Sequence, residues 1–164
     1  MRFNESNFLE ILKQHEKILF KVSNAYCEDI EDRKDIVQEI IIQLWRSKHK
    51  YNPDYRFSTW IYRISLNVAI SHYRKTTRRK STEVDMNDEL INISDENSAN
   101  GHLDQQLETL HRFINNLDKL HKALMLLYLE NYNYREISEV LGISETNVAT
   151  KINRIKKRLK TWFE

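Results

Sequence analysis

Residues that break helices or form tight turns are almost absent from this chain. Its 164 residues include two glycines, Gly101 and Gly142, and one proline, Pro53. β-Sandwiches need many tight turns, and dinucleotide-binding domains and P-loop enzymes need glycine-rich loops that approach phosphates closely. The sequence lacks the residues for all of these folds. It therefore favours an all-α fold with few connections.

The length permits one medium domain or two small helical domains, and the 40% of hydrophobic residues can build compact cores. Cys27 is the single cysteine, so no internal disulfide can form, which fits a reducing cytoplasm. The six histidines include no i, i+4 pair and form no cluster with the cysteine. We expect no metal and no other cofactor.

No segment is typical of a membrane span or a signal peptide. The longest apolar run, residues 123–129, has seven residues, whereas a membrane helix needs about 20. The N-terminus carries Glu5, Glu10 and Lys13 where a signal peptide would be apolar. We expect a soluble, cytoplasmic protein with no membrane insertion.

The net charge of +2 hides three blocks of different sign. Residues 1–80 hold 16 Lys and Arg against 10 Asp and Glu, and residues 111–164 hold 10 against 6. Between them, residues 81–110 hold eight acidic residues and no Lys or Arg. Two basic segments that flank an acidic one are compatible with two units that bind nucleic acid.

Apolar residues repeat at helical spacing on both sides of the acidic block. They predict one helix over 8–22, a second whose first turn lies in the acidic stretch 28–32 and whose apolar residues run from 36 to 45, and a third that Ser58 caps and that ends near Arg79. Periodicity resumes at Leu103. We therefore expect two small helical domains, over 1–80 and 103–164, joined by an acidic flexible linker over 81–102.

The sharpest motif is a helix-turn-helix at 134–160. Gly142 lies where the chain must turn between two helices, and Ser144 is placed to cap the second. If Val148 and Ile152 pack inward, the opposite side of that second helix can enter the major groove of DNA. An αα-hairpin with a solvated basic face is the alternative interpretation. The side chains expected on the DNA-facing side are Thr146, Ala149, Thr150, Asn153, Arg154 and Lys157.

Aromatic residues crowd together between positions 51 and 62, interleaved with Arg56 and followed by Arg63. Aromatic faces stack on bases that have left a duplex, and arginines neutralise the strand. Some of these rings must belong to the core, and we expect Phe57 and Trp60 there. The pattern favours binding of unpaired nucleic acid.

Two segments resemble bacterial RNA polymerase sigma factors. The stretch DIVQEIIIQLW at 35–45, followed by FSTWIYRISLN at 57–67, resembles the core of their second conserved region, and the helix-turn-helix resembles their fourth. With no third-region domain between the two, the chain is similar to the extracytoplasmic-function (ECF) group. The resemblance implies a subunit that is not itself an enzyme. It implies binding to core polymerase through the β′ and β subunits, promoter recognition and melting, and possible control by an anti-sigma factor.

The resemblance also implies roles for particular residues. Asp35, Gln38 and Glu39, spaced i, i+3 and i+4, share a face that would bind the β′ coiled coil. A solvated, capping acidic face is the alternative. The helix-turn-helix would read the minus-thirty-five element. The residues implied in capturing the strand at the minus-ten element are Tyr51, Tyr55, Arg56, Tyr62, Arg63, Asn67 and Arg74.

Two other functions fit parts of the sequence. A helix-turn-helix transcription regulator that binds duplex DNA independently of polymerase would not need the 35–39 face or the aromatic loop. A nuclease would need a constellation of carboxylates or histidines for metal or acid–base chemistry. The acidic residues here are expected in helix caps and in the linker.

Overall fold

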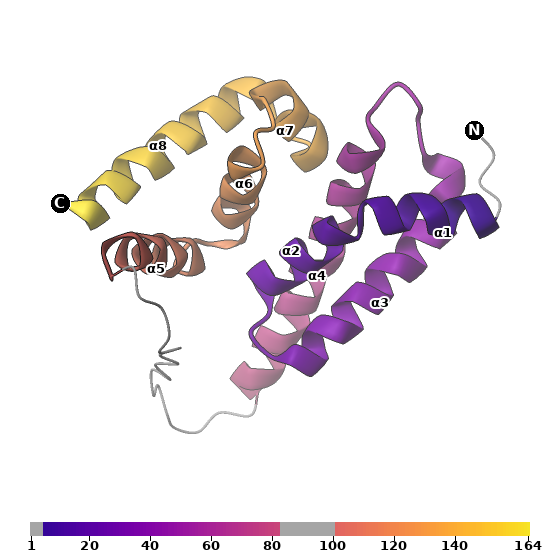
Figure 1. Cartoon of the computed structure of the whole chain (residues 1–164), viewed down its shortest axis with the longest axis horizontal. Helices are drawn as coiled ribbons and strands as arrows, with labels where there is room; N and C mark the ends of the chain where they lie inside the picture. The colour runs from indigo at the N-terminus through magenta and orange to yellow at the C-terminus, as the bar shows by residue number, and fades with distance from the viewer. Residues whose placement is uncertain (1–4, 83–100) are drawn as a thin grey trace.

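The computed structural model describes residues 5–82 and 101–164, and the regular structure in these ranges is entirely helical (Figure 1). It forms two units, one of helices α1 to α4 and one of helices α5 to α8. No helix in the described ranges is both long enough and apolar enough to cross a membrane. The elements are α1 (Glu5–Gln14), α2 (Glu16–Tyr26), α3 (Ile30–Ser47), the 3-10 turn η1 (Lys48–Lys50), α4 (Phe57–Thr82), α5 (Gly101–Asn115), α6 (Lys119–Leu129), α7 (Tyr134–Leu141) and α8 (Glu145–Phe163).

In the first unit, α2 and α3 pack against each other and against the long helix α4. The Asp29 side chain caps α3 by accepting hydrogen bonds from the backbone N–H groups of Glu31 and Asp32, at 2.9 and 3.0 Å. This confirms the acidic start expected for that helix. The fully buried side chains at the centre of the unit include Val22, Ile36, Ile40, Leu44, Ile61 and Leu66.

Two helix boundaries differ from those expected. The single helix expected over 8–22 divides at His15, because its ring bonds back to the Ile11 carbonyl at 3.0 Å and packs edge-on against Phe57. Ser58 does not cap α4, because the helix begins at Phe57 and Ser58 is already its second residue. The Thr59 and Trp60 N–H groups donate to the Arg56 carbonyl, at 3.0 and 3.3 Å. The expected linker, 81–102, lies almost wholly outside the described residues.

In the second unit, α5, α6 and α7 all pack against α8. Gly142 ends α7 in the left-handed conformation, with φ of 68° and ψ of 31°, and its N–H donates to the Ser138 carbonyl at 2.8 Å. The Ser144 hydroxyl then accepts a hydrogen bond from the Asn147 N–H at 3.2 Å. The helix-turn-helix geometry expected from the sequence is thus confirmed at both positions.

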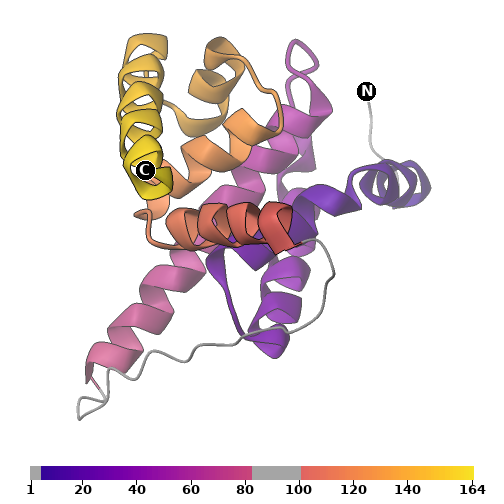
Figure 2. The ribbon, with the colours of Figure 1, turned by 60° about the vertical axis from the view of Figure 1, so that its left-hand side comes forward.

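The two units also contact each other. Both views place α7 beside the start of α4 (Figures 1 and 2), and these two helices pack together. The Tyr26 hydroxyl donates to the Lys119 carbonyl at 2.7 Å, and Lys21 forms an ion pair with Glu130. The units therefore meet through polar contacts as well as through packed helices.

Gly142 supplies a test of the turn. Gly142→Ala should lower the free energy of unfolding by about 1–2 kcal/mol, because residues with a Cβ disfavour the left-handed region. An added Cβ would meet nothing within 4 Å, so the loss should come from the backbone conformation alone. Urea unfolding measures it. Gly142→Asn is the control and should lose less, because asparagine adopts this conformation more readily. Equal losses in the two variants would contradict this explanation.

Tyr26 supplies a test of the contact between units. Burial, helped by the nearby Asp118 carboxylate, raises the pKa of Tyr26 above its ordinary value of 10.0. The stability that the protonated hydroxyl contributes is therefore fully present below about pH 10 and is lost as the pH rises further. Tyr26→Phe should cost about 1 kcal/mol at neutral pH. In urea unfolding above pH 10, the free energy of unfolding of the variant should also fall less steeply with pH than that of the parent protein. An equally steep alkaline loss in the variant would count against the assignment.

Candidate functional site

Helix α8 presents a polar and basic side that faces away from the core of its unit. Val148, Ile152 and Ile155 point inward and are fully buried. The six residues predicted to face DNA lie together on the other side. Thr146, Thr150, Asn153, Arg154 and Lys157 are exposed, and Ala149 is partly buried.

One basic residue of α8 is directed elsewhere. The Lys156 Nζ lies 4.3 Å from the centre of the Tyr128 ring on α6. A hydrogen bond with that tyrosine raises the pKa of Lys156. The basic residues between Lys151 and Lys160 therefore do not all lie on the side predicted to face DNA, because Lys156 packs against α6.

A second polar and basic face runs along α4. Arg56 immediately precedes the helix, and Arg63, Asn67 and Arg74 follow at intervals of seven, four and seven residues. These intervals place side chains on nearly the same side of an α-helix. All four are exposed, so the structure brings together four of the residues predicted to bind the minus-ten element.

The aromatic residues before and at the start of α4 form a cluster. The ring centres of Tyr51, Phe57 and Trp60 lie between 5.2 and 5.5 Å apart. Phe57 and Trp60 are partly buried and pack against the core. Tyr51 is also partly buried, and its hydroxyl donates to the Tyr55 carbonyl at 3.0 Å. Tyr55 is 44% exposed. Of these rings, Tyr55 is the most accessible to a ligand.

Tyr62 occupies a different environment from the other predicted residues. It is 1% exposed and packs edge-on against Tyr132, with ring centres 5.3 Å apart. Burial, with smaller effects of Glu130 and Tyr132, raises the pKa of its hydroxyl. The ring therefore lies between the two units and is inaccessible to a base in this arrangement.

The first two arginines of the α4 face contact α7. Arg56 forms an ion pair with Glu136 at 3.0 Å, and Arg63 donates to the backbone carbonyl of Glu139 at 2.8 Å. The same Glu136 carboxylate accepts a hydrogen bond from the Asn133 N–H at 2.9 Å, as part of the capping box of α7. Sequence reasoning did not find these partners, because they lie about 80 residues away and no local pattern connects them.

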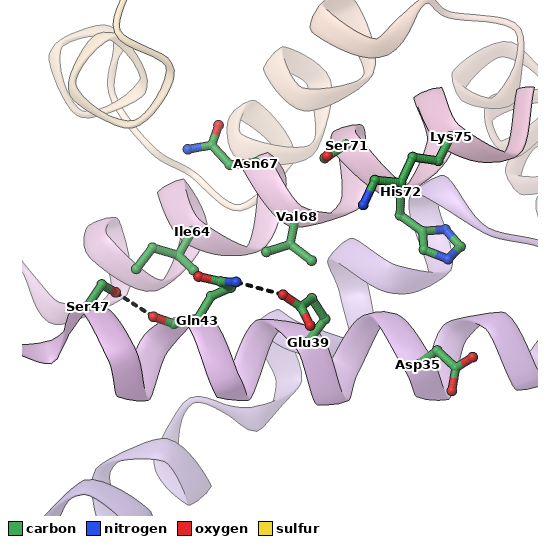
Figure 3. Close-up of a pocket in the computed structure, with 10 residues that line it drawn as sticks. All are labelled: Asp35, Glu39, Gln43, Ser47, Ile64, Asn67, Val68, Ser71, His72 and Lys75. Atoms are coloured by element: carbon green, nitrogen blue, oxygen red, sulfur yellow. Dashed lines mark hydrogen bonds between the residues drawn. The ribbon is translucent and has the colours of Figure 1, made fainter. Parts of the chain in front are cut away.

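A groove of about 630 Å³ lies between α3 and α4 (Figure 3). Asp35 and Glu39, two of the three residues predicted to bind polymerase, line its α3 wall, while Gln38 is exposed outside the groove. Asn67, predicted to bind DNA, lies on the α4 wall. The other lining residues are Gln43, Ser47, Ile64, Val68, Ser71, His72 and Lys75.

The two walls of this groove differ in charge. Gln43 donates to the Glu39 carboxylate at 2.6 Å, which holds that carboxylate in place on α3. His72 and Lys75 stand on the opposite, α4 wall. The groove therefore offers acceptors on one side and donors on the other, an arrangement that suits a protein segment carrying both kinds of group.

Within residues 5–82 and 101–164, no three His, Cys, Asp or Glu residues gather in a way that could hold a metal ion. Cys27 is partly buried, and burial raises the pKa of its thiol. The thiol is therefore largely protonated at neutral pH.

Two family models match the chain. Residues 11–79 match sigma-70 region 2, and residues 107–159 match sigma-70 region 4. The first match contains α3, the aromatic cluster and most of α4, and the second contains the helix-turn-helix. Together the two matches cover most of both helical units.

Curated relatives align over nearly the whole chain. The ECF RNA polymerase sigma factor SigM of Bacillus subtilis is 26% identical over 157 residues, which cover 94% of this chain and 93% of the relative. The RNA polymerase sigma-H factor of Pseudomonas aeruginosa is 28% identical over 160 residues, with 92% and 82% covered.

Solved structures share the fold. The sigma factor RpoE in complex with the anti-sigma factor NepR, from Bartonella quintana, matches with a TM-score of 0.73 and 16% identity over 96% of both chains. CnrH in complex with the cytosolic domain of CnrY matches with a TM-score of 0.69 and 20% identity, over 98% of this chain and 89% of CnrH. The chain belongs to the sigma-70 family, as a sigma factor of the ECF type: a non-catalytic subunit that directs RNA polymerase to promoters.

Proposed function

We propose that this sigma factor divides promoter recognition between two faces, with the α8 side reading the duplex at the minus-thirty-five element and the α4 face capturing the opened strand at the minus-ten element. The observation that carries the proposal is that the two polar and basic faces lie on separate helical units. Each unit can then contact its own element of one promoter.

The α8 side has the chemistry for reading base edges in a duplex. Asn153 and Arg154 are exposed on α8, which begins after its cap at Ser144. Asparagine pairs with adenine and arginine with guanine in the major groove, while hydroxyls and lysines hold phosphates. Thr146, Thr150 and Lys157 are placed to make such phosphate contacts.

The α4 face has the chemistry for holding a single strand. Its three arginines can neutralise phosphates, and Asn67 can hydrogen-bond to a base. The neighbouring loop adds Tyr55 as an exposed ring. Unstacking and unpairing a base costs a few kcal/mol. A protein that does not hydrolyse ATP must recover that free energy by binding the released base. The arginines and the ring together can supply it.

Core polymerase is proposed to bind the α3 side of the first unit. Asp35, Gln38 and Glu39 are exposed on consecutive turns there, and the groove beside them has both donors and acceptors. This contact takes place in the cytoplasm, through the β′ subunit, and the second unit provides the contact with β. An anti-sigma factor is also proposed as a partner of this chain, because RpoE was solved in complex with the anti-sigma factor NepR.

The domains are proposed to extend over 1–80 and 103–164, with 81–102 as an acidic tether. Residues 83–100 carry six carboxylates and no Lys or Arg. About 20 residues span at most about 70 Å when extended, which is about two turns of duplex DNA. Such a tether is long enough for both units to occupy one promoter.

Run-off transcription with purified core polymerase on genomic promoter fragments tests the whole proposal. We expect transcripts with defined start sites that depend on this protein. A regulator that binds DNA independently of polymerase is the alternative, and a pull-down of core polymerase separates the two. Tight binding to duplex DNA without any retention of polymerase would favour the regulator.

The polymerase face can be tested by truncating its side chains. Asp35→Ala combined with Gln38→Ala should weaken binding to core polymerase about tenfold, which corresponds to about 1.4 kcal/mol. Both residues are exposed, so the helicity should not change. Glu31→Ala with Lys34→Ala, an exposed ion pair on the same helix, is the matched control. If a titration shows that the first variant binds core polymerase with unchanged affinity, this side of α3 is not part of the interface.

The recognition helix can be tested at Arg154. Arg154→Ala should weaken duplex binding by about 1–3 kcal/mol if its guanidinium reads a base, and the loss should depend on the base at one position. Arg158→Ala, an exposed arginine on the same helix outside the predicted set, is the control and should lose less, equally on all sequences. Fluorescence anisotropy across promoter variants measures both. An equal loss on every sequence would assign Arg154 to phosphate contact instead.

A further inference from the structure

A cavity of about 380 Å³ lies where the two units meet, beside the start of α6. Tyr26 of α2 and Tyr73 of α4 line it from the first unit, and Lys119 and Lys122 of α6 line it from the second. The Tyr26 hydroxyl, which donates to the Lys119 carbonyl at 2.7 Å, joins the two walls. Sites for small ligands have volumes of about 300–1,000 Å³. The cavity is therefore large enough for a small organic molecule.

The two lysines of this cavity have no anionic partner in the part of the chain that the structure describes. Both side chains are partly buried, and neither forms an ion pair with a carboxylate of residues 5–82 or 101–164. By contrast, Lys21 and Arg56, which also contact the other unit, are each paired with a glutamate. A partly buried cation without a compensating anion is unfavourable. An anion in the cavity would therefore be stabilised by both lysines.

The groups around the two ammonium groups compensate their charge only in part. The Lys119 Nζ lies 4.8 Å from the centre of the Tyr73 ring, and the Lys122 Nζ lies 5.7 Å from the centre of the Tyr26 ring. Such contacts are weaker than a charge-assisted hydrogen bond to an anion. Burial lowers the pKa of Lys122, and the Glu28 carboxylate offsets this only partly. Both ammonium groups therefore have hydrogen-bond donors for a further partner.

The carboxylate in the lining of the cavity, Asp118, serves its own helix. It accepts hydrogen bonds from the Leu120 and His121 N–H groups, at 3.1 and 3.2 Å. It also pairs with the His121 ring. Its charge is therefore used to cap α6 and does not neutralise the two lysines.

We propose that this cavity binds a small phosphomonoester, which is a metabolite that carries one phosphate on an organic group. The two lysines are spaced i and i+3 on one face of α6, and their combined charge of about +2 matches the charge of about −1.5 to −2 on a phosphomonoester at neutral pH. A carboxylate has one negative charge and would leave one lysine uncompensated. The Asn115 amide can donate a further hydrogen bond, and Leu117 and Leu120 offer apolar surface to the organic group.

A ligand in this cavity contacts both units at once, because the two tyrosines belong to the first unit and the two lysines to the second. A ligand that binds only when both walls are present stabilises that arrangement by mass action. The concentration of the phosphomonoester would thereby act on the contact between the units. This inference does not depend on the proposed promoter function.

Titrations of the full-length protein test the chemistry of the ligand. Phenyl phosphate is the probe, because it carries one phosphate on a small apolar ring. Benzenesulfonate, which has the same ring and a single negative charge, is the matched control. Isothermal titration calorimetry at fixed ionic strength measures both affinities. We expect saturable binding of phenyl phosphate that is about fivefold or more tighter than that of benzenesulfonate. Inorganic phosphate, which has no ring, should bind more weakly than phenyl phosphate.

Substitutions test the place of binding. Lys119→Gln combined with Lys122→Gln should weaken the binding of phenyl phosphate about tenfold or more, because both ammonium groups are lost. Lys34→Gln combined with Lys160→Gln makes the same change in net charge at two exposed lysines outside the cavity, and it should bind as the parent does. Circular dichroism checks that both variants keep their helices.

A measurement on the parent protein locates the site without any substitution. In NMR spectra, the backbone amide signals of Leu117 and Leu120 should shift with the concentration of phenyl phosphate, because both residues line the cavity. This test decides the proposal even where a variant fails to fold.

Several outcomes would overturn the proposal. They are the absence of saturable binding, equal affinities for phenyl phosphate and benzenesulfonate, and equal losses in the two double variants. NMR shifts confined to the basic side of α8 would also overturn it, because the anion would then bind at the surface predicted to face DNA. Inorganic phosphate that binds as tightly as phenyl phosphate would overturn the assignment of an organic ligand.

Discussion

Helix α4 is packed on several sides at once, and the other surfaces depend on that packing. Its apolar side, with Ile61 and Leu66, is buried against α2 and α3, and its start also packs against α7. A helix fixed in this way must present its remaining residues in a set register. The groove beside α3, the row of arginines and the contact with the second unit are therefore different sides of one rigid element. A change in the core beneath α4 would disturb all three together.

The parts that the sequence predicted well are those specified by local signals. Gly142 and Ser144 each act within three or four residues, and both occur in the structure with the turn and capping geometry expected of them. Glu31 and Asp32 lie in the first turn of α3, as the acidic stretch there predicted. The division at His15 was not predicted, because a bond from its ring to Ile11 and a contact with Phe57 interrupt an apolar repeat that continues across the break. The predicted roles of the site residues stay predictions.

The contacts between the units lie beyond local reasoning altogether. Arg63 and Glu139 are 76 residues apart in sequence, and Tyr26 and Lys119 are 93 apart. Charge patterning identified basic and acidic blocks but could not pair individual residues across them. The same limit applies to the aromatic residues. The sequence placed Phe57 and Trp60 in the core, whereas the most deeply buried ring near the start of α4 is Tyr62, which α7 and its preceding turn cover.

The contact between the two units leaves some polar surfaces open and occupies part of another. Asp35 and Glu39 on α3, and Asn153 and Arg154 on α8, are exposed while the units are in contact. Arg56 and Arg63 at the start of α4 are exposed too, but the Glu136 carboxylate and the Glu139 carbonyl of α7 already bind them. Because a guanidinium binds a carboxylate and a phosphate through the same charge-assisted hydrogen bonds, any phosphate that binds at this end of α4 must compete with the contacts from α7.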